Sequence, residues 1–150
     1  MGRKCAAATA LATTVLALAG CGGSAEKPLT RSELTAKANA ICKTVTTKLA
    51  TKNITTQQDI ARVAPELASF EQTALTELGK LVPPAALASD WKQFVTDAGT
   101  LAENTLKLGE YAKAKALKAA RGLIDSSETV QRRMQTTAKR DGIVECEQAA

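Results

Sequence analysis

The sequence predicts an all-α protein, an antiparallel up-down four-helix bundle with one disulfide, preceded by a signal peptide and a short tether. Aromatic residues make up only 3% of the 150 residues, so the core must come from Leu, Ile, Val and the helix-favouring Ala. Apolar residues recur at spacings of three and four in four successive stretches, and no segment alternates as a strand would. Short connections join these stretches, which favours antiparallel neighbours.

The first predicted helix begins after Thr30, which forms the sequence pattern of a capping box with Glu33. Cys42 lies in the middle of this helix, beside its apolar stripe. The stripe consists of Leu34, Ala38, Ile41, Val45 and Leu49. These spacings place one apolar face along the whole helix.

The second predicted helix begins near Thr55, with Gln58 three residues later, and ends at Gly79 and the Pro83–Pro84 pair. Its apolar stripe consists of Ile60, Val63, Leu67, Phe70, Ala74, Leu78 and Leu81. Pro65 interrupts the helix, because proline removes a backbone hydrogen bond and clashes with the preceding turn. We therefore expect a kink at Pro65, or a short helix followed by a new helix that starts there.

The third predicted helix begins at or just after Pro84, since proline suits the first helical position. Its stripe consists of Leu87, Trp91, Phe94, Ala98, Leu101, Thr105 and Leu108, and Gly109 is expected to be its C-terminal cap. The fourth predicted helix spans about residues 111–139 and stops at Asp141–Gly142. Its inner face consists of Leu117, Ala120, Ile124, Ser127, Val130 and Met134. The tail, residues 143–146, is expected to fold back toward the first helix.

The amino end has the three parts of a bacterial lipoprotein signal peptide, which we assign to residues 1–20. Arg3 and Lys4 are followed by an uncharged apolar run over residues 6–19, which is too short to cross a membrane. Leu18-Ala19-Gly20-Cys21 then resembles a lipobox. Cleavage before Cys21 would leave that cysteine as the lipid attachment site, with residues 21–29 as a flexible tether and residues 30–150 as the bundle domain. The alternative is an ordinary secretory signal with a chance cysteine.

Two cysteines, Cys42 and Cys146, are then left for the domain, because Cys5 leaves with the signal peptide and Cys21 carries lipid. In an oxidising compartment a disulfide between them is the default expectation. It would close a loop of about 100 residues and contribute about 4.7 kcal/mol in the chain-entropy model. A metal site needs more ligands, and the chain has no His; a redox site would usually show a C-x-x-C motif.

The chain resembles small secreted lipoproteins of actinobacteria that combine a lipobox with a two-cysteine helical domain. The matching positions are Ala38-Asn39-Ala40-Ile41-Cys42, Leu78-Gly79-Lys80-Leu81-Val82-Pro83-Pro84, Trp91 and Cys146. The likeness covers nearly the whole chain after the signal peptide. It implies the fold and the location, and it implies no reaction.

Several kinds of chemistry are excluded or disfavoured by the sequence. The absence of His excludes nucleophilic triads with a His base and zinc sites that use His, and no phosphate-binding glycine loop is present. Glu66 with Glu71, or Glu103 with Glu110, could act as an acid–base pair, but carboxylates at such spacings are usually solvated. Trp91, Phe94 and Phe70 could line a ligand pocket, although their place on the apolar stripes favours a core role. We predict no catalytic, cofactor-binding or metal-binding residue.

The charge of the chain argues against a nucleic-acid partner. Without Arg3 and Lys4, 18 basic residues face 15 acidic ones, a net charge of about +3. Residues 111–140 hold eight Lys or Arg against Asp125 and Glu128. This basic excess is either a solvated helix face or a surface that attracts anionic lipid head groups or wall polymers.

We therefore expect a lipoprotein of the cell envelope, held at the extracytoplasmic face of the membrane by lipid on Cys21. Its expected role is that of a non-enzymatic binding module for another envelope protein or a wall polymer. The alternative is a carrier for a small molecule or a lipid, with a pocket between helices.

Overall fold

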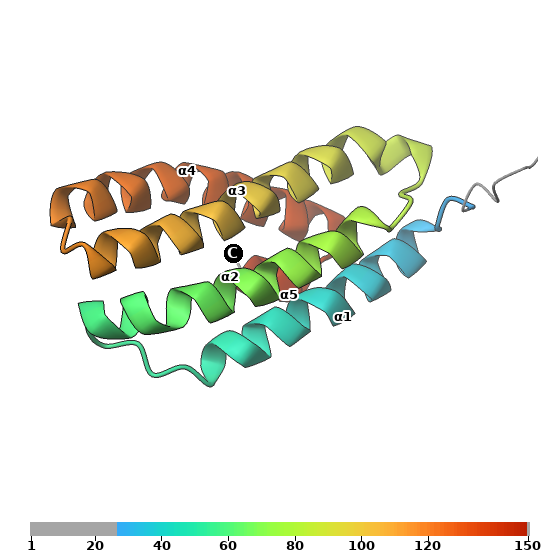
Figure 1. Cartoon of the computed structure of the whole chain (residues 1–150). Helices are drawn as coiled ribbons and strands as arrows, with labels where there is room; N and C mark the ends of the chain where they lie inside the picture. The colour runs from blue at the N-terminus through green and yellow to red at the C-terminus, as the bar shows by residue number, and fades with distance from the viewer. Residues whose placement is uncertain (1–26, 150) are drawn as a thin grey trace, which may run out of the picture.

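The computed structural model describes residues 27–149, which form five α-helices and one 3₁₀ turn without a strand (Figure 1). The helices are α1 (Arg31–Ala50), α2 (Gln57–Gly79), α3 (Ala88–Lys113), α4 (Leu117–Asp141) and α5 (Val144–Ala149), and the 3₁₀ turn η1 spans Ala85–Leu87. The predicted all-α bundle is confirmed. The predicted signal peptide and the lipid attachment site Cys21 lie outside the described residues.

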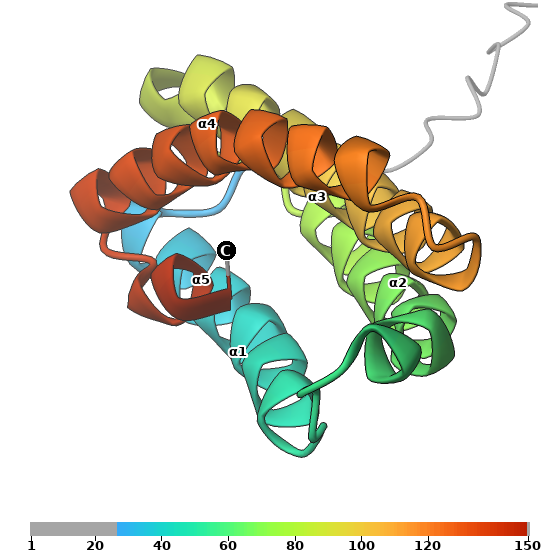
Figure 2. The ribbon, with the colours of Figure 1, turned by 90° about the vertical axis from the view of Figure 1, so that its left-hand side faces the viewer.

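Helices α1 to α4 run alternately up and down, and each packs against the next in the chain (Figure 1). The fifth helix changes the bundle, because α5 lies between α1 and α4 and packs against both (Figure 2). The last turn of α4 reaches α1, where Arg31 donates a hydrogen bond to the carbonyl oxygen of Arg140 at 3.1 Å. We call the end of the bundle that holds α5 the proximal half. The end that holds the loop 51–56 and the turn 114–116 is the distal half.

Capping boxes open the first two helices. Thr30 and Glu33 form the first one, as predicted. The second helix was predicted to begin near Thr55, and a box of Thr56 with Asp59 opens it. The Asp59 carboxylate accepts hydrogen bonds from the Thr56 hydroxyl at 2.8 Å and from the Thr55 amide at 3.3 Å. The bond from Thr56 is the main reason that the pKa of Asp59 lies far below its usual range.

Helix α2 continues through Pro65, so the alternative of a new helix starting at Pro65 is wrong. Pro65 itself is exposed, whereas Val63, Ala64 and Leu67 around it are buried. Burial of these neighbours stabilises the helix on both sides of the proline, which offsets the hydrogen bond that Pro65 cannot make.

Gly109 is not a helix cap, because α3 continues to Lys113 with Ala114 as its C-cap, and Lys115 in the following turn has a φ of 54°. Tyr111 therefore belongs to α3, and the fourth helix begins at Leu117 instead of near residue 111. Gly109 is buried, and a Cβ added to it would lie 2.4 Å from the Cβ of Ala64. This glycine lets α2 and α3 approach closely.

The predicted stop at Asp141–Gly142 is confirmed. Gly142 has a φ of 77°, and the amide of Ile143 donates to the carbonyl oxygen of Ala138 at 2.8 Å. This arrangement ends α4 as a Schellman motif does, with a left-handed glycine just after the last helical residue. The chain then turns back into α5, as expected for the tail.

The tail is fixed to α1 by one covalent bond and several hydrogen bonds. The predicted disulfide between Cys42 and Cys146 is present, over a sequence separation of 104 residues. The Asn39 side chain donates to the carbonyl oxygen of Gly142 at 3.3 Å and accepts from the amide of Glu145 at 3.0 Å. Asn39 thereby satisfies a free amide at the start of α5. The Ala-Asn-x-Ile-Cys stretch is thus the docking site of the tail.

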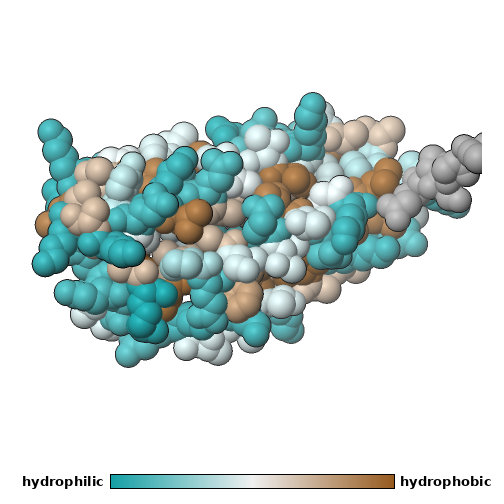
Figure 3. All heavy atoms as spheres, in the orientation of Figure 1, coloured by the Kyte–Doolittle hydropathy of each residue, from teal (hydrophilic) through white to brown (hydrophobic). Residues whose placement is uncertain are grey.

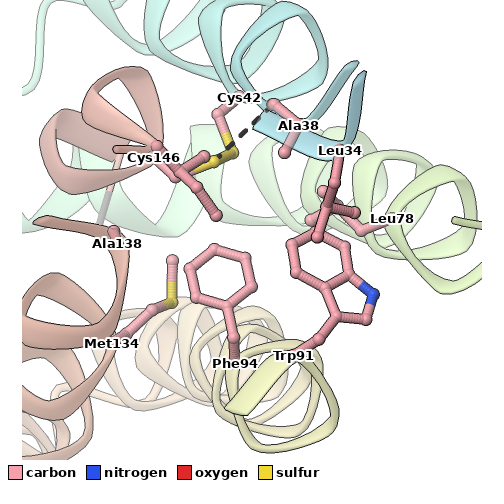
Figure 4. Close-up of a cluster of buried hydrophobic side chains, with 10 residues drawn as sticks. Leu34, Ala38, Cys42, Leu78, Trp91, Phe94, Met134, Ala138 and Cys146 are labelled. Atoms are coloured by element: carbon pink, nitrogen blue, oxygen red, sulfur yellow. Dashed lines mark hydrogen bonds between the residues drawn. A yellow bond between two sulfur atoms is a disulfide. The ribbon is translucent and has the colours of Figure 1, made fainter. Parts of the chain in front are cut away.

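The main core occupies the proximal half (Figure 4). Phe94, Leu34, Ile143 and Cys146 are almost completely buried there. Trp91 is stacked on Phe94 with ring centroids 5.4 Å apart. Met134 and Ala138 of α4 and Leu78 of α2 complete the cluster, so that α1, α2, α3, α4 and α5 all contribute to it.

Candidate functional site

A groove in the distal half is the main concave feature of the described residues, and we call it the distal groove. It consists of two hollows of about 240 Å³ and about 540 Å³ that share Leu108 and Ile124. The inner hollow is lined by Glu71, Leu101, Asn104, Thr105, Leu108, Leu123, Ile124, Ser127, Glu128 and Gln131. The outer hollow is lined by residues 54–57, Ile60, Leu108, Ala112, Leu117, Ala120, Arg121 and Ile124.

The groove stays open because α5 separates α4 from α1 (Figure 2). Leu117 and Ile124 belong to the predicted inner face of α4, and both line the groove. They are nevertheless 66% and 46% exposed, and Ile54 across the groove is 41% exposed. The prediction that this face is covered along its whole length is therefore wrong for the distal half. By contrast, the molecular face in Figure 3 is largely hydrophilic, with apolar residues in small separate patches.

Glu71 of α2 is the most unusual polar residue of the groove. Its Oε1 accepts a hydrogen bond from the Thr105 hydroxyl at 3.2 Å, whereas its buried Oε2 has no hydrogen-bond partner among the described residues. Burial raises the pKa of Glu71 from 4.5 to about 7, although the bond from Thr105 opposes this shift. Glu71 therefore exchanges between a neutral and an ionised carboxyl near neutral pH.

The other polar groups of the inner hollow are bonded within the protein. The Asn104 amide donates to the Ser127 hydroxyl at 2.9 Å, and that hydroxyl donates to the carbonyl oxygen of Leu123 at 2.8 Å. Glu128 is exposed and lies 3.6 Å from Arg132. These contacts brace α3 against α4 along one wall of the groove.

The carboxylate pairs considered from the sequence do not come together in the groove. Glu66 is half exposed and forms an ion pair with Lys52 at 2.7 Å, while Glu71 points to the other side of α2. Glu103 lies 3.8 Å from Lys107, and neither Glu103 nor Glu110 lines the groove. Residues 27–149 also contain no cluster of three or more His, Cys, Asp or Glu that could hold a metal ion.

Trp91, Phe94 and Phe70, which could have lined a ligand pocket, do not line one together in the described part of the chain. Trp91 and Phe94 are core residues, as their place on the stripes favoured. Phe70 is half-buried, and the Lys48 ammonium lies 5.1 Å from its ring centroid. Phe70 and Lys48 line a separate, smaller hollow of about 170 Å³ between α1 and α2.

The basic residues of positions 111–140 fall into two groups. Toward the proximal half Arg132, Arg133 and Arg140 are paired, whereas Lys139 has no ion pair among the described residues. Arg133 bonds the buried Asp97 with Nε–Oδ2 at 2.7 Å, and Arg140 contacts Asp90 at 2.7 Å. The hydrogen bond from Arg133 is the main reason that the pKa of Asp97 is lowered. Toward the distal half, no ion pair within residues 27–149 engages the four remaining cations near the α3–α4 turn. These are Lys113, Lys115, Lys118 and Arg121, and Arg121 lines the groove.

The sequence reasoning considered Glu71 only as a solvated carboxylate or an acid–base partner of Glu66 and did not consider Asp97, although both lie on core positions. Glu71 is four residues from both Leu67 and Leu75, and Asp97 is three residues after Phe94 and four before Leu101. Both positions face the neighbouring helices by helical spacing. A search for acidic residues at apolar-stripe positions would have found both.

No protein-family model matches this chain, and no curated protein or solved structure shows significant similarity to it. The resemblance to small actinobacterial lipoproteins therefore stays a prediction. None of the helices in the described part of the chain is both long and apolar enough to span a membrane.

Proposed function

We propose that this chain is an exported lipoprotein of the cell envelope, anchored at the extracytoplasmic face by lipid on Cys21. Its helical domain is a non-enzymatic binding module. The observation that carries the export part is the Cys42–Cys146 disulfide, because structural disulfides persist in oxidising compartments and are rare in the cytosol. The disulfide and the signal peptide expected for residues 1–20 both favour export. They rest on different residues, so each supports the proposal independently.

The binding role is supported by the distal groove. General acid–base and nucleophilic catalysis need at least two groups in mutual contact, such as a nucleophile and its base. In the groove the buried carboxyl of Glu71 has Thr105 as its hydrogen-bonding neighbour, and the exposed Glu128 pairs with Arg132 instead. An open concave surface with apolar walls suits the capture of a partner better than such a reaction.

The anchor is tested by metabolic labelling with radioactive palmitate and by cell fractionation of the full chain. We expect the wild type to be labelled and to sediment with membranes, and Cys21→Ala to be unlabelled and either soluble or uncleaved. Cys5→Ala is the matched control, since it removes a cysteine of the same leader and should change neither result. Tight membrane association of a cleaved Cys21→Ala protein would contradict the proposal.

The alternative function, a carrier for a small molecule or a lipid, is favoured by one specific observation. The outer hollow of about 540 Å³ has the size of a small-ligand site and lies between helices, as a carrier pocket would. It lies in the distal half, however, and not near Trp91, which the sequence offered as a possible pocket residue.

A further inference from the structure

We propose that the distal groove binds a single-chain amphiphile with an anionic head group. The acyl chain lies along α3 between α2 and α4, and the head group lies at the cations of the α3–α4 turn. This inference rests on the proposal that the domain is a binding module, and it names the class of ligand.

The apolar lining of the groove forms a strip along α3 that could hold one acyl chain. Ile60 of α2, Leu108 and Ala112 of α3, and Ala120 and Ile124 of α4 form a continuous strip across the two hollows. The lining of α3 extends from residue 101 to residue 112, which corresponds to about 16 Å of helix. Because α2 and α4 pack against α3 on its two sides, the strip follows this single helix.

The groove has a positive end. Arg121 lines the outer hollow, and Lys118 lies three residues before it, in the first turn of α4. Lys113 and Lys115 lie at the α3–α4 turn and line a neighbouring hollow that shares Gln57 and Ala112 with the outer one. None of these four cations has an ion pair in the described part of the chain. The first turn of α4 contains no acidic residue, although acidic residues are favoured there. The protein therefore leaves a positive field next to exposed apolar side chains such as Leu117.

The opposite end of the groove is acidic. Glu71 and Glu128 both line the inner hollow; Glu128 is paired with Arg132, so the ionised Glu71 carboxylate is the group there that would repel an anion. Hence the charges at the two ends fix the direction of the ligand, with the anionic head outside and the end of the acyl chain inside. A cationic amphiphile would meet the wrong charge at the mouth, and a purely polar anion would leave the apolar strip uncovered.

The test uses the oxidised full chain carrying Cys21→Ser and isothermal titration calorimetry with dodecyl compounds below their micelle concentrations. We expect dodecanoate and dodecyl phosphate to bind about tenfold more tightly than dodecanol, and dodecyltrimethylammonium to bind more weakly than dodecanol. Acetate, which has the charge without the chain, should give no signal. Equal binding of the anionic and cationic compounds would overturn the proposal, as would binding to anionic vesicles without binding to monomeric dodecanoate.

Two pairs of variants locate the ligand. Ile124→Asp should weaken dodecanoate binding at least about tenfold, whereas Leu106→Asp should not, because Leu106 is equally exposed but lies outside the groove. Lys118→Gln with Arg121→Gln should remove the preference for dodecanoate over dodecanol, whereas Lys43→Gln with Lys92→Gln removes the same charge elsewhere and should preserve it. Binding that is insensitive to both groove variants would exclude the groove as the site.

The outcomes separate this inference from the proposed function. If the protein is labelled with palmitate on Cys21 but does not bind dodecanoate, the ligand class is wrong and the anchored module stands. If dodecanoate binds in the groove but Cys21 carries no lipid, the ligand class stands and the proposed lipid anchor is wrong.

Discussion

The proximal and distal halves of the bundle are built from the same four long helices but differ in how they are closed. In the proximal half α5 fills the space between α1 and α4, and the disulfide, the Trp91–Phe94 pair and the buried Ile143 form a dense core. In the distal half nothing in residues 27–149 takes the place of α5. Apolar side chains of α4 are exposed there, and Glu71 is partly buried, with one buried oxygen that has no hydrogen-bond partner among the described residues.

This difference shows how a short tail shapes a site that it does not touch. A helix of six residues is too short to be stable by itself, so α5 depends on the disulfide and on Asn39 for its position. Once fixed, it keeps α1 and α4 apart, and past the end of α5 the distal groove lies between α2 and α4 along α3. Stability is thus concentrated at one end of the molecule and an accessible apolar surface at the other.

The largest expected effect is on the proximal half. Replacing both Cys42 and Cys146 by Ser should lower the free energy of unfolding by about 4.7 kcal/mol, because a bond across 104 residues no longer restricts the unfolded chain. Chemical denaturation measures the loss, and hydrogen exchange should show it first in α5 and the adjoining turns of α1. Equal stability of the oxidised and reduced wild type would mean that the tail is held by packing alone.

The second effect belongs to the distal half and depends on pH. Since the pKa of Glu71 is raised in the fold, the stabilisation from its bound proton is complete below about pH 4.5, declines as the pH rises to about 7, and is then absent. This increase in the pKa of Glu71 corresponds to about 3 kcal/mol in the free energy of unfolding. The side chain of the Glu71→Gln variant cannot ionise. The free energy of unfolding of this variant relative to the wild type should therefore rise by about 3 kcal/mol between about pH 4 and about pH 8. Urea unfolding at both pH values measures the change, and parallel pH curves for the two proteins would contradict the burial of this carboxyl.

The smallest effect tests whether helices are poorly packed throughout the distal half or only between α1 and α4. Gly109→Ala should destabilise the protein by about 2 kcal/mol, because the new methyl group overlaps Ala64 and forces α2 away from α3. Ala64→Gly should recover part of this loss in the double variant.

Gly122→Ala is the matched control, since a Cβ at this exposed position of α4 meets no atom within 4 Å. It should stabilise α4 by up to about 1 kcal/mol through helix propensity. Thermal unfolding distinguishes the two variants, and equal melting temperatures would show that α2 and α3 can separate without cost.

The sequence predicted the parts of the fold that depend on local chemistry or on a covalent pair. The Thr30 capping box, the glycine stop at Gly142 and the Cys42–Cys146 bridge each have a pattern that is visible within a few residues or by counting cysteines. Gly109 was misread because a glycine can serve a close helix contact as well as a helix end. The sequence alone does not show that Ala64 lies opposite to it.

The candidate site was harder to predict because it exists where no helix covers the apolar face of α4 in the distal half. Leu117 and Ile124 have the spacing of a buried face, and that spacing does not reveal whether a partner helix covers it. The tail also gave no periodic signal, since six residues make less than two helical turns. Glu71 could have been recognised from its position on the stripe, but its pKa depends on a three-dimensional environment.

The disulfide also determines which parts of the chain bear tension. A pull applied between the amino and carboxyl ends follows the backbone of α1 to Cys42, crosses the sulfur–sulfur bond, and leaves through Cys146. Helices α2, α3 and α4 lie inside the closed covalent ring and are bypassed by this load path. A domain that is held by its amino end can therefore bear a pull on its carboxyl end without unfolding of the three helices that line the groove.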